Sequence, residues 1–285
     1  GHPSTISEQD LVQLRQAGAT RLSFGAESME DGDLLRIGRP GAVSETITAM
    51  AKARSAGFTN INLDLMYGLP GQSLTSWENT LTHCLALQPT HLSLYQLTIE
   101  EGTPFHDLYA RGKLVPPADG AAGDLFELTQ QQCNAAGLPA YEVSNHAKPG
   151  QECRHNLVYW RAGRWLGIGP GAHGRRGGLA TVRHKKPENW LGAVARNGHG
   201  LQAEDRLRPA ERAREALVMG LRLGEGVDLG LVAKRCEVDA DTLVNHRQAE
   251  VLEHHGLILR ERDRLTVTAA GMLLLDRILV ELVEV

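Results

Sequence analysis

The chain has 285 residues, of which 42% are hydrophobic and 22% charged, a composition typical of a folded protein with room for two domains. It holds no apolar run of about 18 residues, as a membrane-spanning helix needs, and its first residues do not have the pattern of a secretory signal peptide. The four cysteines, Cys84, Cys133, Cys153 and Cys236, are too sparse for a disulfide framework or a zinc site. A reducing, cytoplasmic location is therefore expected.

The net charge of −4 is unevenly distributed. Between residues 148 and 200 there are ten Lys and Arg residues but only two acidic ones, Glu152 and Glu188. Such a basic segment fits an anionic ligand, peripheral contact with a lipid membrane, or an acidic partner protein. It fits equally a solvated basic face balanced by acidic neighbours in the fold, and both interpretations stay open.

Strand and helix patterns alternate over the first 100 residues. Ser44 is the expected N-cap of one helix and Gly57 its end. The alternation predicts a parallel β-sheet with helical crossovers. The expected strands are residues 19–28, 58–70 and 91–100, and the expected helices are residues 7–18, 44–57 and 73–89.

Three strands with their helices are too few for a complete barrel. The predicted fold class is therefore α/β, with the C-terminal half of a (β/α) barrel followed by a small α+β domain. A parallel sheet that opens on a helix lacks a neighbour for its first strand, so we expect a chain that is truncated at its N-terminus. The exposed edge of such a half-barrel also invites dimerisation or strand swapping, so a homodimer is expected either as a genuine state or as an artefact of the truncation.

The alternation ends near Thr103, and a different pattern follows Leu207. There, helix patterns over 209–223, 228–236 and 240–256 precede a hairpin that turns at Arg262 and Asp263 and a closing helix over 269–282, which predicts a winged-helix-like fold. The expected domains are residues 1–102, the C-terminal half of a barrel; residues 103–206, a linker and motif region that packs on the barrel; and residues 207–285, the winged-helix-like domain.

The charge of this last domain argues against nucleic-acid binding. Residues 206–285 contain 12 Lys and Arg residues against 14 Asp and Glu residues. Since phosphate neutralisation supplies most non-specific affinity for DNA, an acidic domain is better interpreted as an internal cap or a docking module.

Charged residues fall near the ends of the first two predicted strands. Glu27 follows the first strand, where Gly25 allows close approach of a ligand, and Asp64 lies late in the second strand. Arg39 lies in the segment that joins them. Ligands of parallel (β/α) folds bind at this end of the strands, and two carboxylates with a guanidinium suit a ligand that has hydroxyls and a carboxylate. Alternatively, Asp64 caps a loop and Arg39 neutralises it.

The segments RLSFGAES, LLRIGR, NINLDLMYGLPGQS and HLSLYQLTIEEGTP resemble the radical S-adenosylmethionine (SAM) proteins of the oxygen-independent coproporphyrinogen III oxidase superfamily. The segment YEVSNHAKPGQECRHNLVYWRAGRWLGIGPGAH is similar to the HemW heme-chaperone branch of that superfamily. The resemblance covers nearly the whole chain.

The resemblance implies that Glu27, Arg39 and Asp64 contact SAM, with Glu27 where the family usually has Gln. It also implies a [4Fe-4S] cluster in the full-length protein. The family's Cys-x3-Cys-x2-Cys motif has no match among the four cysteines, so we expect this chain to lack the cluster-binding segment and not to cleave SAM reductively.

The same resemblance assigns a heme-binding HNxxYW motif to residues 155–160. Imidazole is a good ligand of heme iron, so His155 is the expected metal ligand, and aromatic rings stack on a porphyrin. In a helix or a strand alike, His155 and Tyr159 share a face. Alternatively, the histidine is a packing residue and the tryptophan wedges against the barrel. The four motif residues are His155, Asn156, Tyr159 and Trp160.

Neighbouring residues extend this candidate heme site. Arg154, Arg161 and Arg164 are candidates for pairing with the propionates. Cys153 is a second candidate iron ligand, or else a buried structural thiol. His173 is a weaker candidate, expected in a loop near the mouth of a pocket.

Three functional hypotheses follow. The preferred one is a heme chaperone that delivers heme to acceptor proteins. The alternative is a radical SAM enzyme, either an oxygen-independent coproporphyrinogen III oxidase or a related methyltransferase, and catalysis by this chain stays uncertain. The third is a docking module, for which deletion after Leu207 should abolish partner binding and leave heme binding intact.

Overall fold

A computed structural model describes residues 1–39, 41–117 and 119–284. The chain divides into two compact units, Gly1–Glu152 (unit 1) and Cys153–Val285 (unit 2). The three domains expected from the sequence, with boundaries at 102/103 and 206/207, stay a prediction. In the part of the chain that is described, no helix is both long and apolar enough to cross a lipid bilayer.

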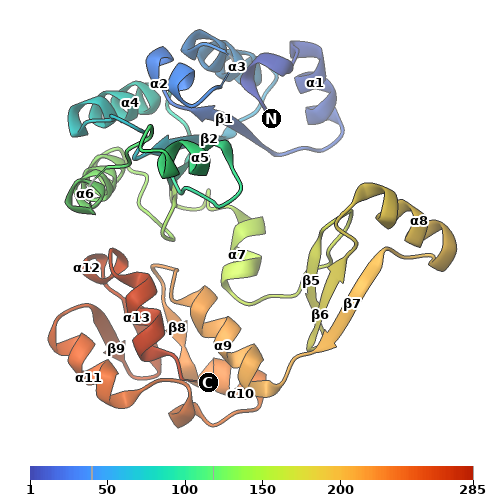
Figure 1. Ribbon diagram of the computed structural model, residues 1–285, viewed down its shortest axis with the longest axis vertical. Helices are drawn as coiled ribbons and strands as arrows, with labels where there is room; N and C mark the ends of the chain where they lie inside the picture. The colour runs from blue at the N-terminus through green and yellow to red at the C-terminus, as the bar shows by residue number, and fades with distance from the viewer. Residues whose placement is uncertain (40, 118, 285) are drawn as a thin grey trace. The chain divides into compact units, whose positions relative to one another are not determined.

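The sheet of unit 1 has the strand order β1-β2-β3-β4 (Figure 1). The first three strands are parallel, as predicted, and β4 pairs with β3 in the antiparallel direction. The fourth strand was not expected, because three residues are too few to show a strand alternation. The strands are β1 (Arg21–Glu27), β2 (Asn60–Tyr67), β3 (His91–Gln96) and β4 (Asn145–Ala147).

The three helices predicted over residues 7–18, 44–57 and 73–89 are present as α1, α3 and α4, with one correction at a helix start. The N-cap of α3 is Ala42, not Ser44, and the Glu45 carboxylate accepts the hydrogen bond of the Ala42 N–H at 3.2 Å. A carboxylate at this third helical position replaces the expected serine cap. Gly57 ends the helix with φ +87°, as expected. The helices are η1 (Pro3–Thr5), α1 (Glu8–Gln16), α2 (Asp31–Arg36), α3 (Val43–Ser55), α4 (Leu74–Ala86), α5 (Pro104–Ala110) and α6 (Asp119–Ala135).

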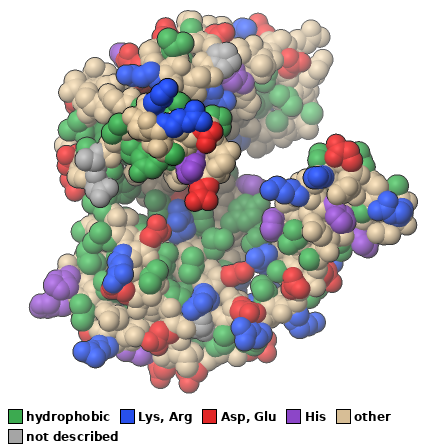
Figure 2. All heavy atoms as spheres, viewed as in Figure 1, with side chains coloured by type: hydrophobic (Ala, Val, Ile, Leu, Met, Phe, Trp, Pro, Cys, Tyr) green, Lys and Arg blue, Asp and Glu red, His purple; other side chains and the backbone are tan. Residues whose placement is uncertain are grey.

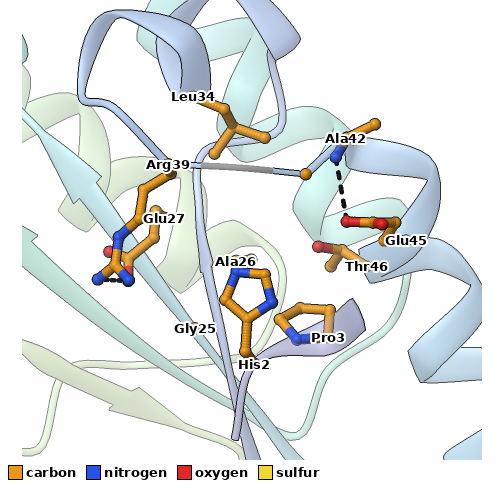
Figure 3. Close-up of a pocket in the computed structure, with 11 residues that line it drawn as sticks. His2, Pro3, Gly25, Ala26, Glu27, Leu34, Arg39, Ala42, Glu45 and Thr46 are labelled. Atoms are coloured by element: carbon orange, nitrogen blue, oxygen red, sulfur yellow. Dashed lines mark hydrogen bonds and ion pairs between the residues drawn. The ribbon is translucent and has the colours of Figure 1, made fainter. Parts of the chain in front are cut away.

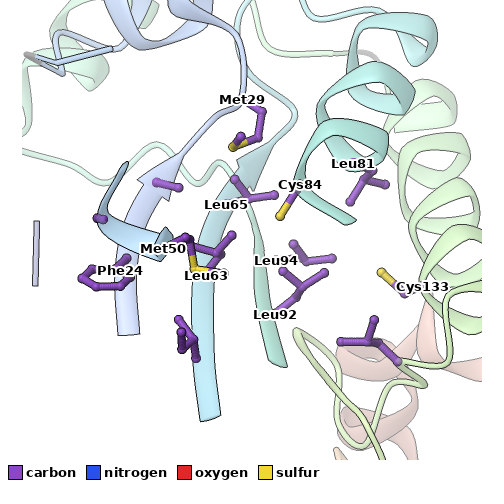
Figure 4. Close-up of a cluster of buried hydrophobic side chains, with 14 of the residues drawn as sticks. Phe24, Met29, Met50, Leu63, Leu65, Leu81, Cys84, Leu92, Leu94 and Cys133 are labelled. Carbon is purple, nitrogen blue, oxygen red and sulfur yellow. The ribbon is translucent and has the colours of Figure 1, made fainter. Parts of the chain in front are cut away.

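The two faces of the unit 1 sheet differ in polarity. On one face, buried side chains such as Phe24, Leu63 and Leu92 pack against helices α3, α4 and α6 to form the core (Figure 4). Because side chains alternate along a strand, the residues between them face the other way, and these are mainly polar. Parallel sheets are usually apolar on both faces, so the polar face is expected to serve a ligand. Its polar residues include Arg21, Ser23, Glu27, Asn60, Asn62, Asp64, His91, Ser93 and Asn145.

Unit 2 begins with the short helix α7 (Arg154–Trp160) and a three-stranded antiparallel sheet of order β5-β6-β7. Its strands are β5 (His173–Arg176), β6 (Leu179–Arg183) and β7 (Leu201–Arg206), with α8 (Pro187–Asn197) between the last two (Figure 1).

The rest of unit 2 has helices and a small sheet of order β8-β10-β9, as expected for a winged-helix-like fold. The hairpin turns at Arg262, whose φ of +55° is the left-handed conformation of a tight turn. The elements are α9 (Pro209–Gly220), β8 (Val227–Asp228), α10 (Leu229–Cys236), η2 (Ala240–Thr242), α11 (His246–His254), β9 (Ile258–Glu261), β10 (Arg264–Val267), α12 (Ala269–Met272) and α13 (Leu275–Leu282).

Two of the helices expected in this region are broken. Residues 240–256 form the short helix η2 and then α11, because the Asn245 side chain accepts from the Gln248 N–H and so caps a new helix. Residues 269–282 form α12 and α13, which are separated near Leu273 and Leu274. In residues 240–256, side-chain capping by Asn245 therefore outweighs the apolar periodicity that predicted a single helix.

Candidate functional site

The end of β1 brings Glu27 and Arg39 together. Glu27 is the last residue of the strand, at a break in the register with β2, and has a φ of +64°. Its Oε1 accepts a hydrogen bond from an Arg39 amino group at 2.7 Å, and only 13% of its side chain is exposed, against 48% for Arg39 (Figure 3). The ion pair borders an open hollow that is also lined by Gly41 and Thr46.

Burial raises the pKa of the Glu27 carboxyl above its ordinary value. The Arg39 guanidinium opposes this shift, and the negative charge of Asp64 adds to it. The side chain is therefore held between a neutralising cation and a like charge, a setting that is common at ligand sites.

Asp64 lies on the same face of the sheet, where it is paired in register with Gly25 on β1. Its Oδ2 accepts from the Ser23 hydroxyl at 3.0 Å, and its Oδ1 accepts from the Asn62 amide at 2.7 Å. It does not line the hollow beside Glu27 and Arg39. The structure thus joins Glu27 to Arg39, whereas Asp64 belongs to a neighbouring hydrogen-bond network.

That network includes a histidine that sequence reasoning missed. The Tyr141 hydroxyl lies 2.9 Å from His91 Nε2, and His91 Nδ1 lies 2.7 Å from Asn62 Oδ1. Burial lowers the pKa of His91 to about 3, so the ring is neutral. Since the Asn62 oxygen can only accept, Nδ1 donates and Nε2 accepts. A directed chain therefore runs from Tyr141 through His91 and Asn62 to Asp64.

A sequence signal for this network was available. In the predicted strands, Asn62 and Asp64 alternate with apolar residues, and so do His91 and Ser93. A parallel strand buried on both faces would be apolar throughout, so this alternation marks a polar inner face.

A buried carboxylate joins the loops that follow β1 and β2. Asp33 is fully buried and pairs with Arg36. It also accepts from the Ser28 hydroxyl at 3.1 Å and from the Gln72 amide at 3.4 Å. The Gln72 oxygen accepts in turn from the Gly68 N–H at 2.8 Å. These contacts fix the loops on the ligand side of the strands.

Helix α7 of unit 2 carries the four motif residues. The His155 side chain is exposed, and its Nε2 lies 3.0 Å from the Tyr159 hydroxyl. The two rings are 4.9 Å apart at 85°. The expected sharing of a helix face is confirmed, and the imidazole is not sealed in the core; its heme role stays a prediction. Asn156 is half-buried.

Trp160 packs within unit 2 on the winged-helix-like region. The Arg222 guanidinium lies 4.9 Å from the centre of its ring. The indole N–H of Trp160 is buried and has no hydrogen-bond partner among the described residues. Trp160 therefore holds α7 to its neighbours by stacking, which agrees better with a packing role than with direct ligand contact.

Trp165 is an aromatic neighbour that sequence reasoning missed. Its ring lies 4.8 Å from that of Tyr159 at 71°, and its indole N–H donates to the His173 carbonyl at 3.1 Å. The sequence signal was the WRAGRW run, which places a second tryptophan five residues after Trp160. Together, His155, Tyr159 and Trp165 form a row of rings.

The other candidate residues around α7 differ in exposure and in whether their side chains are already paired. Arg161 pairs with Glu225 through two hydrogen bonds of 2.8 Å, so its guanidinium is already engaged. Arg154 and Arg164 are exposed. Cys153 is half-buried at the N-cap of α7 and is not the buried thiol that was considered. His173 is exposed and begins β5, so it is not in a loop as expected.

The basic segment of residues 148–200 is partly neutralised in the fold. Besides Arg161, Arg175 pairs with Glu215, and Arg176 pairs with Glu204. Lys, Arg and His side chains are spread over the part of unit 2 that carries α8 (Figure 2). Acidic neighbours therefore balance some of the charge, as one of the two interpretations expected.

The described residues do not fit an iron–sulfur cluster. Nowhere in residues 1–39, 41–117 and 119–284 do three or more His, Cys, Asp or Glu side chains form a group that could hold a metal ion. Cys84, Cys133 and Cys236 are buried thiols, and burial raises the pKa of each. A buried, protonated thiol is a poor metal ligand.

Comparisons with known proteins place these features in a family. Residues 2–84 match the family "Radical SAM superfamily", and residues 207–274 match "HemN C-terminal domain". The heme chaperone HemW of Bacillus subtilis is 34% identical over 273 residues, which cover 96% of this chain and 72% of that protein. Radical S-adenosyl methionine domain-containing protein 1, mitochondrial, of Mus musculus is 34% identical over an alignment of 295 positions, which covers 99% of this chain and 66% of that protein.

A solved structure shares the fold. Coproporphyrinogen III oxidase (HemN) from Escherichia coli, a radical SAM enzyme, superposes with a TM-score of 0.79 and 22% sequence identity, over 98% of this chain and 67% of that chain. This chain spans from 66% to 72% of the length of the two relatives compared above. The identity to the Bacillus subtilis protein and the share of it that is covered decide the assignment: the chain belongs to the HemW family of radical SAM proteins.

Proposed function

We propose that this chain binds heme on α7 and that the complete protein delivers the heme to acceptor proteins. The observation that carries the proposal is the exposed imidazole of His155 beside the rings of Tyr159 and Trp165. Imidazole binds heme iron, and aromatic rings favour contact with a flat macrocycle. The name of the Bacillus subtilis relative, a heme chaperone, supports the same function.

The charges around α7 fit the propionates of heme. Arg154 and Arg164 are exposed, at the start of α7 and shortly after its end. We assign the propionates to these two side chains rather than to Arg161, which is paired with Glu225. A guanidinium gives a carboxylate two parallel hydrogen bonds, which makes arginine the preferred partner.

Titration with hemin tests this function. We expect the native chain to give a Soret band and His155→Ala to raise the Kd at least about 10-fold, as loss of an iron ligand implies. His254→Ala removes another exposed imidazole of unit 2, on α11, and should leave the Kd unchanged. An identical Kd and spectrum for native and His155→Ala would refute His155 as the iron ligand.

The polar end of the unit 1 strands is proposed to hold SAM. One amino group of Arg39 is held by Glu27, and its remaining N–H groups would pair with the carboxylate of the methionine moiety. The carboxylates of Glu27 and Asp64 would accept from the hydroxyl and amino groups of SAM. The buried setting of Glu27 and its ion pair with Arg39 support this assignment. When bound with a cluster in the complete protein, SAM supplies radical chemistry; the described residues position it.

An enzyme is the second candidate function, either a porphyrinogen oxidase or a related methyltransferase. The polar face of the sheet with its neutral His91 favours it, because such a face suits a reactive ligand. Formation of protoporphyrinogen by the full-length, cluster-loaded protein would establish it and displace the chaperone function. Cytoplasmic location, peripheral membrane contact and a homodimer stay predictions.

A further inference from the structure

Nε2 of His155, on the imidazole proposed above to bind heme, already has a hydrogen-bond neighbour. The Tyr159 hydroxyl lies 3.0 Å from Nε2 of the His155 ring, one helical turn away. If Nε2 is protonated, it donates to the hydroxyl and has no free lone pair. If Nε2 is unprotonated, its lone pair accepts the hydroxyl proton. In both tautomers this nitrogen is unavailable to a metal ion.

The Tyr159 ring is itself held in place by three further residues. Its partner Trp165 lies at 4.8 Å, edge to face. The Arg175 guanidinium lies 5.8 Å from the centre of the Trp165 ring and is fixed by two hydrogen bonds of 2.9 Å to Glu215 on α9. The hydroxyl is therefore presented to His155 by a supported ring, not by a freely rotating one.

Of the two imidazole nitrogens, Nε2 is the one that a planar macrocycle can approach. Nδ1 is next to the ring carbon that joins Cβ, so a planar macrocycle approaching Nδ1 would meet the helix backbone. Nε2 lies on the far side of the ring and can reach an iron at the centre of a porphyrin.

We propose that the Tyr159 hydroxyl competes with heme iron for Nε2 of His155, so that heme ligation requires this hydrogen bond to break. Tyr159 is then a positioning residue that weakens heme retention and favours release of the cargo. The inference rests on the proposed heme function and adds to it the regulation of the same site. In this proposal His155 binds the heme iron, and the Tyr159 hydroxyl limits how tightly the heme is held.

The size of the effect follows from the strength of one hydrogen bond. A net intramolecular hydrogen bond corresponds to about a 2- to 10-fold change in an equilibrium constant. Replacing tyrosine by phenylalanine removes the hydroxyl and keeps the ring that packs on Trp165. We therefore expect Tyr159→Phe to bind hemin about 2- to 10-fold more tightly than the native chain.

The experiment compares hemin titrations of the native chain, Tyr159→Phe, His155→Ala and Tyr109→Phe. The last removes the hydroxyl of a half-exposed tyrosine on α5 of unit 1 and should have no effect. Tighter binding by Tyr159→Phe with weaker binding by His155→Ala supports the proposal. Equal or weaker binding by Tyr159→Phe overturns it and, with His155→Ala still impaired, leaves heme binding by His155 standing.

A second measurement tests the hydrogen bond without heme. Nitrogen-15 NMR of the histidine side chains should show a shift of His155 Nε2 between the native chain and Tyr159→Phe, with the other histidines unchanged. An unshifted signal overturns the proposal whatever the heme affinities are. A shifted signal with unimpaired binding by His155→Ala means that the proposed heme ligand is wrong and that no competition for iron exists.

Discussion

His91 is a buried imidazole that the fold keeps uncharged. Burial is the largest cause that lowers its pKa to about 3, and Arg21 and His146 act in the same direction. Burial likewise lowers the pKa of His146 to about 4. An unfolded histidine titrates near 6.5, so between these values the unfolded chain binds more protons than the folded one. The free energy of unfolding of unit 1 therefore falls as the pH is lowered through this window.

Replacement of His91 should reduce this pH sensitivity. Glutamine cannot take up a proton, so from pH 7 to pH 5 the free energy of unfolding of His91→Gln should fall by about 2 kcal/mol less than that of the native chain. Hydrogen exchange of β1 to β3 peptides at increasing urea measures this. As a control, His254→Ala should leave the pH dependence of the free energy of unfolding of unit 1 as it is in the native chain. The same pH dependence in His91→Gln would show that His91 is already protonated in the folded state at pH 5.

Helix α7 depends on its neighbours for its structure. It has seven residues, and an isolated helix of this length is unstable in water. The Arg235 guanidinium donates to the carbonyls of Arg161 at 3.3 Å and Ala162 at 2.6 Å, next to the helix end. Arg222 covers Trp160 from the same region of unit 2. The helix that presents His155 is thus ordered by residues more than 60 positions later in the chain.

Removal of the Arg235 guanidinium should loosen the end of α7. Since hydrogen bonds from a charged donor are worth more than neutral ones, we expect Arg235→Ala to lower the local opening free energy by about 1–2 kcal/mol. Hydrogen exchange of a peptide spanning residues 153–163 reports this change. Arg247→Ala, on α11, is the control; equal protection in both variants would show that the two carbonyl contacts do not hold the helix.

At the scale of the whole molecule, each unit contains one candidate site. Unit 1 has the polar strand ends with Glu27 and Arg39, and unit 2 has α7. The contacts that support α7 come from α9, α10 and the segment between them. Deletion after Leu207, expected from sequence to spare heme binding, would remove all of these supports.

We therefore predict that a chain ending at Leu207 loses heme affinity. Its hemin Kd should rise by about 10-fold or more, since α7 without its neighbours is a marginal helix, while the exchange protection of β1 to β3 in unit 1 stays native. Hemin titration and hydrogen exchange measure the two effects. An unchanged Kd would show that α7 orders independently of the winged-helix-like region.

The sequence by itself determined the alternation of strands and helices in unit 1, the hairpin at Arg262 and the shared face of His155 and Tyr159. Each depends on local periodicity, turn chemistry or helical spacing, which a short segment carries within itself. The same local patterns failed at Ser44 and at residues 240–256, where capping by Glu45 and Asn245 set the helix starts.

Only the tertiary structure decided which side chains meet. The chain from Tyr141 to Asp64 joins residues more than 70 positions apart, and Trp165 reaches Tyr159 across a loop. The sequence made Arg161 a candidate partner of a heme propionate, whereas in the fold it is paired with Glu225. Such contacts depend on the packing of distant elements, and no local pattern encodes them, because strand pairing and helix docking are set by the burial of the whole core.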